Sequence, residues 1–258
     1  MSAGRIIIRE LDRAAQLTEV QELARAAWGF SDRALPAVTD LMAAHHVGGL
    51  TAAAFEGRRM LGFIHGLPRT NLAEPCHHSH MLAVHPDAQG RGLAARLKFF
   101  QRRWCLRRGI RLMTWTFDPL IVKNAHLNLV KLRARAHVYI RNFYGPLGGI
   151  YQGLPTDRFE MHWRLDATDV EAAAHGRAAP FPTLASWPLA GTVRLPRAGR
   201  VAVEIPLGAP ALYARDPRAA RAARLRLRRQ AEALIAAGYQ GTAFEVLDKS
   251  ARYGFTRP

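Results

Sequence analysis

The sequence predicts an α/β protein, and three observations support this fold class. Strand-like and helix-like segments alternate from the first residues onward. A buried strand, a glycine loop and an amphipathic helix follow one another between His80 and Phe100. A further strand, helix and strand follow after residue 200. This alternation is typical of a sheet flanked by helices.

The elements before and after the central segment are read from hydrophobic periodicity. The first half contains strands, helices and a hairpin, in the order Ile6–Arg9 (strand), Asp12–Trp28 (helix), Ser31–His46 (helical, broken early by Pro36), and Gly48–Phe55 with Met60–Leu67 (hairpin). After the central helix we expect the strand Arg111–Phe117, the short helix Asn124–Leu132 and the strands Ala136–Phe143 and Phe159–Leu165.

The central segment begins with an apolar run that reads as a buried strand and ends at His85-Pro86-Asp87. The loop Gln89–Gly92 follows, and a helix starts near Leu93 with apolar residues at helical spacing. The first turn of a helix has backbone N–H groups without intrahelical partners and a positive dipole end. Glycines at Gly90 and Gly92 let an anion approach these groups. The segment therefore predicts a phosphate or pyrophosphate site.

Two common phosphate motifs do not fit this loop. No Gly-Lys-Ser/Thr follows it, so the Walker pattern is absent. The Rossmann fingerprint requires a further glycine that the loop lacks. The pattern present is Gln-x-x-Gly-x-Ala, at Gln89, Gly92 and Ala94, preceded by Leu-x-Val-x-Pro at Leu82 to Pro86.

This pattern resembles the acyl-CoA signature of the GNAT superfamily of N-acyltransferases. The resemblance implies a GNAT fold, with a mixed and mostly antiparallel twisted sheet flanked by helices. It also implies acetyl-CoA or another acyl-CoA as co-substrate, with its pyrophosphate in the loop and its pantetheine along the preceding strand. The residues expected to bind the coenzyme are Leu82, Val84, Gln89, Gly90, Arg91, Gly92, Leu93, Ala94, Asn124 and Asn128.

A narrower resemblance rests on four short stretches of the chain. They are Trp115–Leu120, Asn124–His126, Asn142–Gly145 and Leu154–Phe159, and they are similar to a bacterial group of predicted GNAT proteins. Some relatives of that group accompany amino-acid N-acylation. The resemblance implies a small amine, such as an amino acid, as the acceptor.

Acyl transfer to an amine needs a base for the amine proton and an acid for the leaving thiolate. His80 is the candidate base, because a neutral imidazole accepts a proton near pH 7. Period-two geometry predicts that His78, His80 and Leu82 share one face of the strand. His78 is the second candidate and Glu160 a distant third, and a structural role for His80 stays open.

The candidate acid is Tyr144. Many GNAT enzymes carry a tyrosine on the short helix after the next strand, but Asn124–Val130 contains none. Tyr139 is the alternative, and both tyrosines could be packing residues. Metal ligation by His77, His78 and His80 is a further reading, but it lacks Cys or carboxylate support at ligand spacing, and we expect no metal.

The formal net charge of +17 points first to nucleic acid or an anionic ligand. The basic residues are spread along the chain with few aromatic residues among them, so we expect biased composition rather than a nucleic-acid partner. No apolar stretch approaches the length of about 20 residues that spans a membrane. The two cysteines, Cys76 and Cys105, make no disulfide framework, and a reducing cytoplasm is the expected location.

Three segments organise the chain in this reading. They are a GNAT domain at 1–165, a linker or extended wrap at 166–199, and a strand-helix-strand extension at 200–258 that docks on the core. The extension contains a strand at Arg200–Ile205, a helix that ends at Ala237 and a last strand at Thr242–Leu247. Its helix has an arginine face, expected to be solvated, with Arg221, Arg224 and Arg228.

The sequence thus predicts a cytoplasmic N-acyltransferase that moves an acetyl or succinyl group from acyl-CoA to a small amine. Two alternatives stay open: a non-catalytic acyl-CoA-binding regulatory module, which the missing helix tyrosine favours, and a basic protein associated with nucleic acid. The acyl group, the acceptor and the oligomeric state are open as well, with a homodimer among the options.

Overall fold

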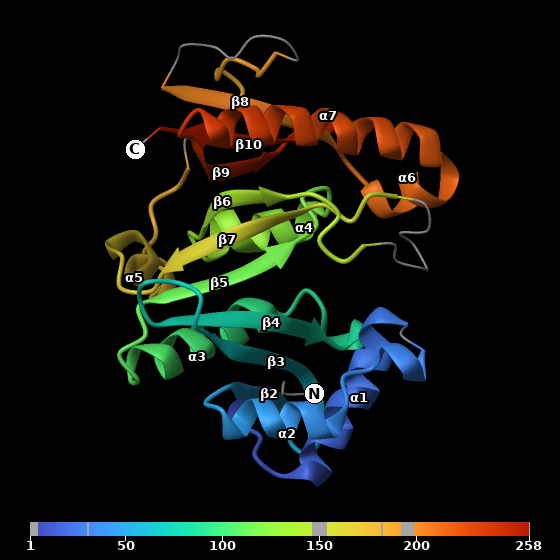
Figure 1. Cartoon of the computed structure of the whole chain (residues 1–258), viewed down its shortest axis with the longest axis vertical. Coiled ribbons are helices and arrows are strands. Elements are labelled where there is room, and N and C mark those ends of the chain that lie inside the picture. Colours follow the sequence, from blue (N-terminus) through green and yellow to red (C-terminus); the bar gives the residue numbers. More distant parts are fainter. Residues whose placement is uncertain (1–4, 30, 146–153, 182, 192–198, 258) are drawn as a thin grey trace. The chain divides into compact units, whose positions relative to one another are not determined.

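The structure is a computed structural model that describes residues 5–29, 31–145, 154–181, 183–191 and 199–257. The chain divides into two compact units. The first comprises residues 1–115 and 164–166, and the second comprises 116–163 and 167–258. Figure 1 shows the helices and strands with their labels.

Within its described residues, the first unit contains five strands in the order β1-β2-β3-β4-β5. Its strands are β1 (Ile6–Glu10), β2 (Leu50–Glu56), β3 (Arg59–Arg69), β4 (Cys76–Val84) and β5 (Leu112–Phe117), whose last two residues belong to the second unit. The pairs from β1 to β4 are antiparallel, and β4 pairs with β5 in parallel. Its helices are α1 (Ala14–Trp28), η1 (Asp32–Ala34), α2 (Val38–His46), η2 (Pro86–Ala88) and α3 (Leu93–Leu106).

Helices cover the sheet of the first unit because their apolar stripes match it. On α1, Leu17, Val20 and Ala24 recur at helical spacing and are fully buried. They form a core cluster with residues of β2, β3 and β4, including Phe63 and Ala83. The helix α3 packs against β2, β3 and β4 as well.

The second unit contains strands in the order β7-β6-β9-β10-β8. They are β6 (Arg135–Ile140), β7 (Arg158–Arg164, of which Arg164 belongs to the first unit), β8 (Arg200–Pro206), β9 (Gln240–Val246) and β10 (Ser250–Thr256). The pairs β6–β7, β6–β9, β9–β10 and β10–β8 are all antiparallel. Its helices are α4 (Val122–Ala125), the π-helical turn η3 (His126–Lys131), α5 (Thr168–Ala174), α6 (Ala209–Arg215) and α7 (Pro217–Ala236).

The C-terminal segment differs in two respects from its predicted strand-helix-strand pattern. It contains the additional helix α6, and β10 follows β9 as an additional strand. Tyr253 and Phe255 of β10 are fully buried, and both lie against Phe159 of β7, with ring centroids 5.4 and 6.2 Å away. Asp216 and Pro217 start α7 as predicted, with the Asp216 carboxylate accepting a hydrogen bond from Ala219 N.

The segment predicted as a linker is more regular than expected. It contains α5, which begins at Thr168, and a parallel bridge from Leu189 to Ala202. Part of the predicted wrap, at 182 and 192–198, lies outside the described residues. Among the helices that the structure describes, none combines the length and apolarity needed to cross a bilayer.

Candidate functional site

The predicted glycine loop follows β4 in the first unit. Gly90 and Gly92 both have left-handed backbones, with φ values of 79° and 72°. A Cβ atom added to either glycine would meet no atom within 4 Å, so both open onto free space. Glycine adopts this conformation without strain, and it leaves the backbone accessible.

The start of α3 supplies hydrogen-bond donors beside these glycines. Gly92 is the N-cap and offers no side-chain cap. The first helical hydrogen bond runs from Arg96 N to Gly92 O, so the N–H groups of Leu93, Ala94 and residue 95 lie outside the helical ladder. An open loop with free donors at a helix N-terminus fits a pyrophosphate group.

Ion pairs attach the loop to the neighbouring hairpin. Arg91 Nη2 lies 2.6 Å from Glu56 Oε1, and this hydrogen bond lowers the pKa of Glu56. Arg59 Nη2 lies 2.7 Å from Asp87 Oδ2. Gln89 Nε2 donates to Val84 O at 3.5 Å. The Arg91 guanidinium is therefore held by a carboxylate at the end of β2.

The strand β4 changes its pairing along its length. Its parallel register with β5 covers Cys76, His77 and His78 alone. Against β3 the register continues to Val84, with an irregularity at which His65 pairs with Met81 and Gly66 pairs with Ser79. His80 is therefore the extra residue of a β-bulge.

The bulge reverses the alternation of side chains and corrects the predicted common face of His78, His80 and Leu82. Before the bulge, Ser79 faces α3. After it, Met81 packs with the core cluster of α1, and Val84 lies beside Leu97 of α3. Alternation then places Leu82 on the α3 face. Leu82 and His78 consequently lie on opposite faces of the sheet.

His78 and His80 do lie near each other, and a third histidine joins them. The ring centroids of His78 and His80 are 6.3 Å apart, and those of His65 and His80 are 6.4 Å apart. His80 is exposed, yet the surrounding protein desolvates its ring enough to lower its pKa below the usual 6.5. His78 Nδ1 lies 3.1 Å from Thr114 Oγ1. Of the three, His80 is the solvent-accessible imidazole that is neutral at pH 7.

A buried polar layer supports the bulge from the α3 side. Lys98 is 2% exposed, donates from Nζ to Ser79 Oγ at 2.9 Å and lies 3.5 Å from the centroid of the Trp115 ring. Burial lowers the pKa of Lys98 well below its ordinary value. His77, fully buried, lies 3.0 Å from Gln101 Nε2 through its Nε2 atom, and burial lowers its pKa to about 3.

Sequence reasoning missed this layer, although a signal was present. The signal is Lys98, which follows Leu97 in the apolar part of α3. A lysine on a helix normally faces solvent. Gly66 lies opposite the bulge, and glycine occupies this position for a steric reason. A Cβ there would lie 2.3 Å from His77 Nε2 and 2.7 Å from His78 O. Close approach of the two strands at the bulge therefore requires glycine.

The predicted asparagines lie in the second unit. Asn124 is half-buried in α4. Asn128 is buried in the π-helical turn η3. Wide turns of this kind are rare and occur often at functional sites.

The predicted acid, Tyr144, also lies in the second unit, on the turn after β6. It is 43% exposed, and its ring packs edge-on against Phe143 with centroids 4.7 Å apart. The alternative, Tyr139, is buried and donates to Asp157 Oδ2 at 2.9 Å, and burial raises its pKa. Glu160 is buried and accepts from His162 at 3.0 Å. Of these groups, only Tyr144 is an accessible proton donor.

The candidate metal ligands His77, His78 and His80 all lie on β4. Within the described ranges, no group of three or more His, Cys, Asp or Glu side chains could hold a metal ion. The two cysteines are both buried and free, and burial raises the pKa of Cys105 to about 12.

Comparison with known proteins agrees with the order of these elements. Residues 16–126 match the acetyltransferase (GNAT) family. No curated protein matches the chain. A solved GNAT-family acetyltransferase from Desulfovibrio desulfuricans is 18% identical, with a TM-score of 0.51, over 62% of this chain and 99% of that one.

Two further solved structures have the same fold. The ribosomal-protein-S18-alanine N-acetyltransferase from Escherichia coli is 17% identical, with a TM-score of 0.50, over 64% of this chain and 96% of that one. An acetyltransferase from Salmonella typhimurium, solved with its cofactor acetyl-CoA, is 16% identical, with a TM-score of 0.50, over 70% of this chain and 100% of that one. The similarity at these identities establishes the fold, which is the mixed α/β GNAT fold predicted from the sequence.

Proposed function

We propose that this chain, whose residues 16–126 match the acetyltransferase (GNAT) family and which has the GNAT fold, transfers an acyl group from acetyl-CoA or another acyl-CoA to a small-molecule amine such as an amino acid. The observation that carries the proposal is the open glycine loop at the N-terminus of α3. Gly90 and Gly92 leave the backbone donors of the first helical turn accessible, as a pyrophosphate requires.

The coenzyme would bind along two backbone features of the first unit. The loop from Gln89 to Gly92, with Leu93 and Ala94, supplies donors for the pyrophosphate. The strand from Leu82 to Val84, whose register lies against β3 alone, supplies edge groups for the pantetheine amides. Asn124 and Asn128 of the second unit are proposed to hydrogen-bond the pantetheine or the thiolate.

His80 is proposed to accept the proton of the attacking amine, directly or through water. Its lowered pKa keeps the ring neutral at pH 7, so its lone pair is available. The amine nitrogen then attacks the thioester carbonyl, and the C–S bond breaks as the tetrahedral intermediate collapses. Tyr144 is proposed to donate the proton that the leaving thiolate takes up.

A non-catalytic acyl-CoA-binding role is the second candidate. The turn from Asn124 to Val130, where many GNAT enzymes place the acid, contains no tyrosine. In this case the coenzyme would bind normally, but no amine would be acylated.

A paired experiment tests the proposal. Isothermal calorimetry with coenzyme A measures binding, and a thiol-release screen crosses acetyl- and succinyl-CoA with amino acids of both configurations and with polyamines. Binding together with amine-dependent thiol release is expected. Binding without release for every amine would favour the regulatory role, and absence of binding would remove the glycine loop from the site. A gel shift at several salt concentrations tests the nucleic-acid alternative.

A further inference from the structure

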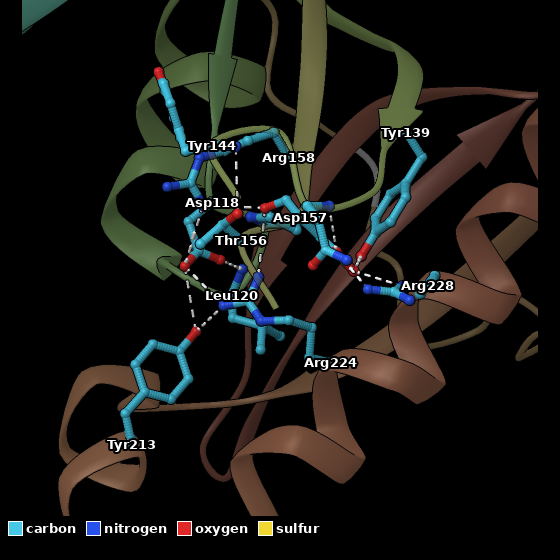
Figure 2. A network of polar contacts seen from close by, with 12 residues as sticks. Asp118, Leu120, Tyr139, Tyr144, Thr156, Asp157, Arg158, Tyr213, Arg224 and Arg228 are labelled. Carbon is cyan, nitrogen blue, oxygen red and sulfur yellow. Dashed lines mark hydrogen bonds and ion pairs between the residues drawn. The ribbon is translucent and has the colours of Figure 1, made fainter. Parts of the chain in front are cut away.

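The helix α7 sends two arginines into the interior of the second unit (Figure 2). Arg224 is fully buried, and its Nη2 atom lies 2.8 Å from Asp118 Oδ2. Arg228 donates to both carboxylate oxygens of Asp157, at 2.8 and 2.6 Å. Both carboxylates are 3% exposed or less. The prediction that this arginine face is solvated is therefore wrong for Arg224 and Arg228.

The first of these pairs holds the turn that leads into α4. Asp118 Oδ1 accepts from Leu120 N at 2.9 Å, so the carboxylate shapes the turn directly. Tyr213 of α6 and Tyr253 of β10 add hydrogen bonds, to Asp118 Oδ2 and to Pro119 O. Four residues after Leu120, the chain reaches Asn124, whose amide is proposed to contact the coenzyme.

The second pair holds the turn after β6 that carries Tyr144. Asp157 Oδ1 accepts from Asn142 N at 3.1 Å, and Asn142 has a left-handed backbone with φ of 46°. Thr156 Oγ1 accepts from Tyr144 N at 3.3 Å and donates to Gly145 O at 2.9 Å. These hydrogen bonds thus fix the backbone on both sides of Tyr144.

A third arginine contacts Asp118 of the first pair and the ring of Tyr144. Arg158 Nη1 lies 3.8 Å from Asp118 Oδ2, and the Arg158 guanidinium lies 5.2 Å from the centroid of the Tyr144 ring. Asp118 raises the pKa of Arg224 against the lowering effect of burial. Burial alone would raise the pKa of Asp157, but the hydrogen bonds of Arg228 and Asn142 hold it below its usual value. Arg224 and the Asp157 carboxyl group are therefore charged at neutral pH.

Stability alone is a weak reason for such a network, because apolar residues of similar volume are often as good in a protein interior. What buried ion pairs can provide is a fixed geometry. The turn fixed here carries two exposed aromatic residues, Phe143 and Tyr144, which are 42% and 43% exposed. A buried ionic network that fixes the turn of exposed aromatic side chains is useful when those side chains bind another molecule.

We propose that Arg224 and Arg228 are positioning residues for acyl transfer, which fix the turn into α4 and the turn of Tyr144. The C-terminal helix is then part of the catalytic apparatus, although it lies beyond the residues that match the family. This inference rests on the proposed function, because it assigns a purpose to Tyr144 and Asn124.

The test compares Arg224→Gln and Arg228→Gln with the matched control Arg229→Gln in the full chain. Arg229 is exposed on the same helix and belongs to neither pair. kcat and KM are measured for the acyl-CoA and the amine that the thiol-release screen identifies, at a temperature where circular dichroism shows every variant folded. We expect kcat/KM to fall at least tenfold in the first two variants and to stay unchanged in the control. The kcat/KM of Arg228→Lys should lie between those of the wild type and Arg228→Gln, because lysine keeps the charge and loses the bidentate geometry.

Hydrogen–deuterium exchange gives a readout that does not depend on activity. Faster exchange confined to residues 118–128 in Arg224→Gln and to residues 139–145 in Arg228→Gln supports the inference. Folded variants with wild-type kcat and KM would overturn it and leave the network a stabilising role only. If the wild-type protein acylates no amine, the proposed function fails by itself. Unchanged exchange in both segments would then overturn the positioning role separately.

Discussion

At the residue scale, the character of each histidine follows from its burial. His65 and His77 are both buried, and burial lowers their pKa values to about 4 and about 3. His80 sits on the bulge and stays accessible. The cluster His77-His78-Ser79-His80 reads as one polar stretch in the sequence, and only the fold separates a buried histidine from an accessible one.

His80→Ala should lower kcat/KM about a hundredfold or more, the usual effect of a positioned base. In the wild-type protein, kcat/KM should fall as the pH drops below 6.5, because protonation removes the lone pair and the pKa of His80 lies below that value. A pH–rate profile checks both points. His175→Gln, an exposed histidine of the second unit, should leave the profile unchanged. Near-normal turnover in His80→Ala would assign the proton to water or to His78.

His77 predicts a loss of stability in acid. The unfolded chain takes up this proton near pH 6.5, whereas the folded protein resists it down to about pH 3. Stability is therefore complete above pH 6.5 and falls below it, by about 2–3 kcal/mol for this group at pH 4.5. His77→Gln keeps a hydrogen-bonding amide and does not titrate. Urea unfolding measures the free energy of unfolding at pH 7.0 and 4.5. The loss of this free energy between the two pH values should be smaller in the variant by that amount. An equal loss in both proteins would show that His77 does not resist protonation.

At the element scale, the strand, loop and helix of the proposed coenzyme site were predicted closely. The predicted helix start near Leu93 is the first residue of α3, and both loop glycines have the positive φ that the motif requires. These features depend on local rules of turn and helix chemistry. The bulge at His80 was not predictable, because it is defined by the register between β4 and β3, which the alternation of apolar residues does not reveal.

Other elements were missed for similar reasons. The strand β10 contains Gly254 and Arg252 among its apolar residues, which weakens its alternating pattern. On α7, Ala220, Arg224 and Leu227 recur at spacings of four and three and are all buried. The prediction placed Arg224 on the solvated arginine face, opposite the apolar stripe, although its spacing from Leu227 fits the stripe. The carboxylate that compensates its charge is 106 residues away and is not visible in the local pattern.

Gly92→Val tests the loop as an element. The backbone at φ 72° should cost the variant about 1–2 kcal/mol of stability, and the added Cβ and its methyl groups occupy the space where an anion would meet the helix. Gly109→Val is a matched control, because Gly109 follows the other end of α3 with the same φ of 72° and the same open space. Calorimetry should show loss of coenzyme A binding in Gly92→Val alone. Equal affinity in the two variants would contradict a role for the loop.

At the scale of the whole molecule, the region after residue 200 forms a large part of the second unit. The predicted domains, 1–165, 166–199 and 200–258, stay a proposal, with the last segment docked on the GNAT core. In the structure, β9 pairs with β6 through Ala136 and Gly241, and the region shares its unit with residues 116–163. The rings of Tyr253 and Phe244, 4.9 Å apart, extend an aromatic core that begins at Phe159 of β7.

Ending the chain near Arg197 should therefore disrupt the fold rather than trim an appendage. The truncation removes β8, α6, α7, β9 and β10, exposes Phe159 and leaves Asp118 and Asp157 without Arg224 and Arg228. Breaking a buried ion pair by removing one partner costs about 3–5 kcal/mol, a large part of the 5–15 kcal/mol that a typical domain has. We expect an aggregating product without a cooperative thermal transition, measured by light scattering and differential scanning calorimetry against the full chain. A soluble truncate with the full melting temperature and full thiol release would instead show that the region is independent, and Arg224 and Arg228 would then have no part in acyl transfer.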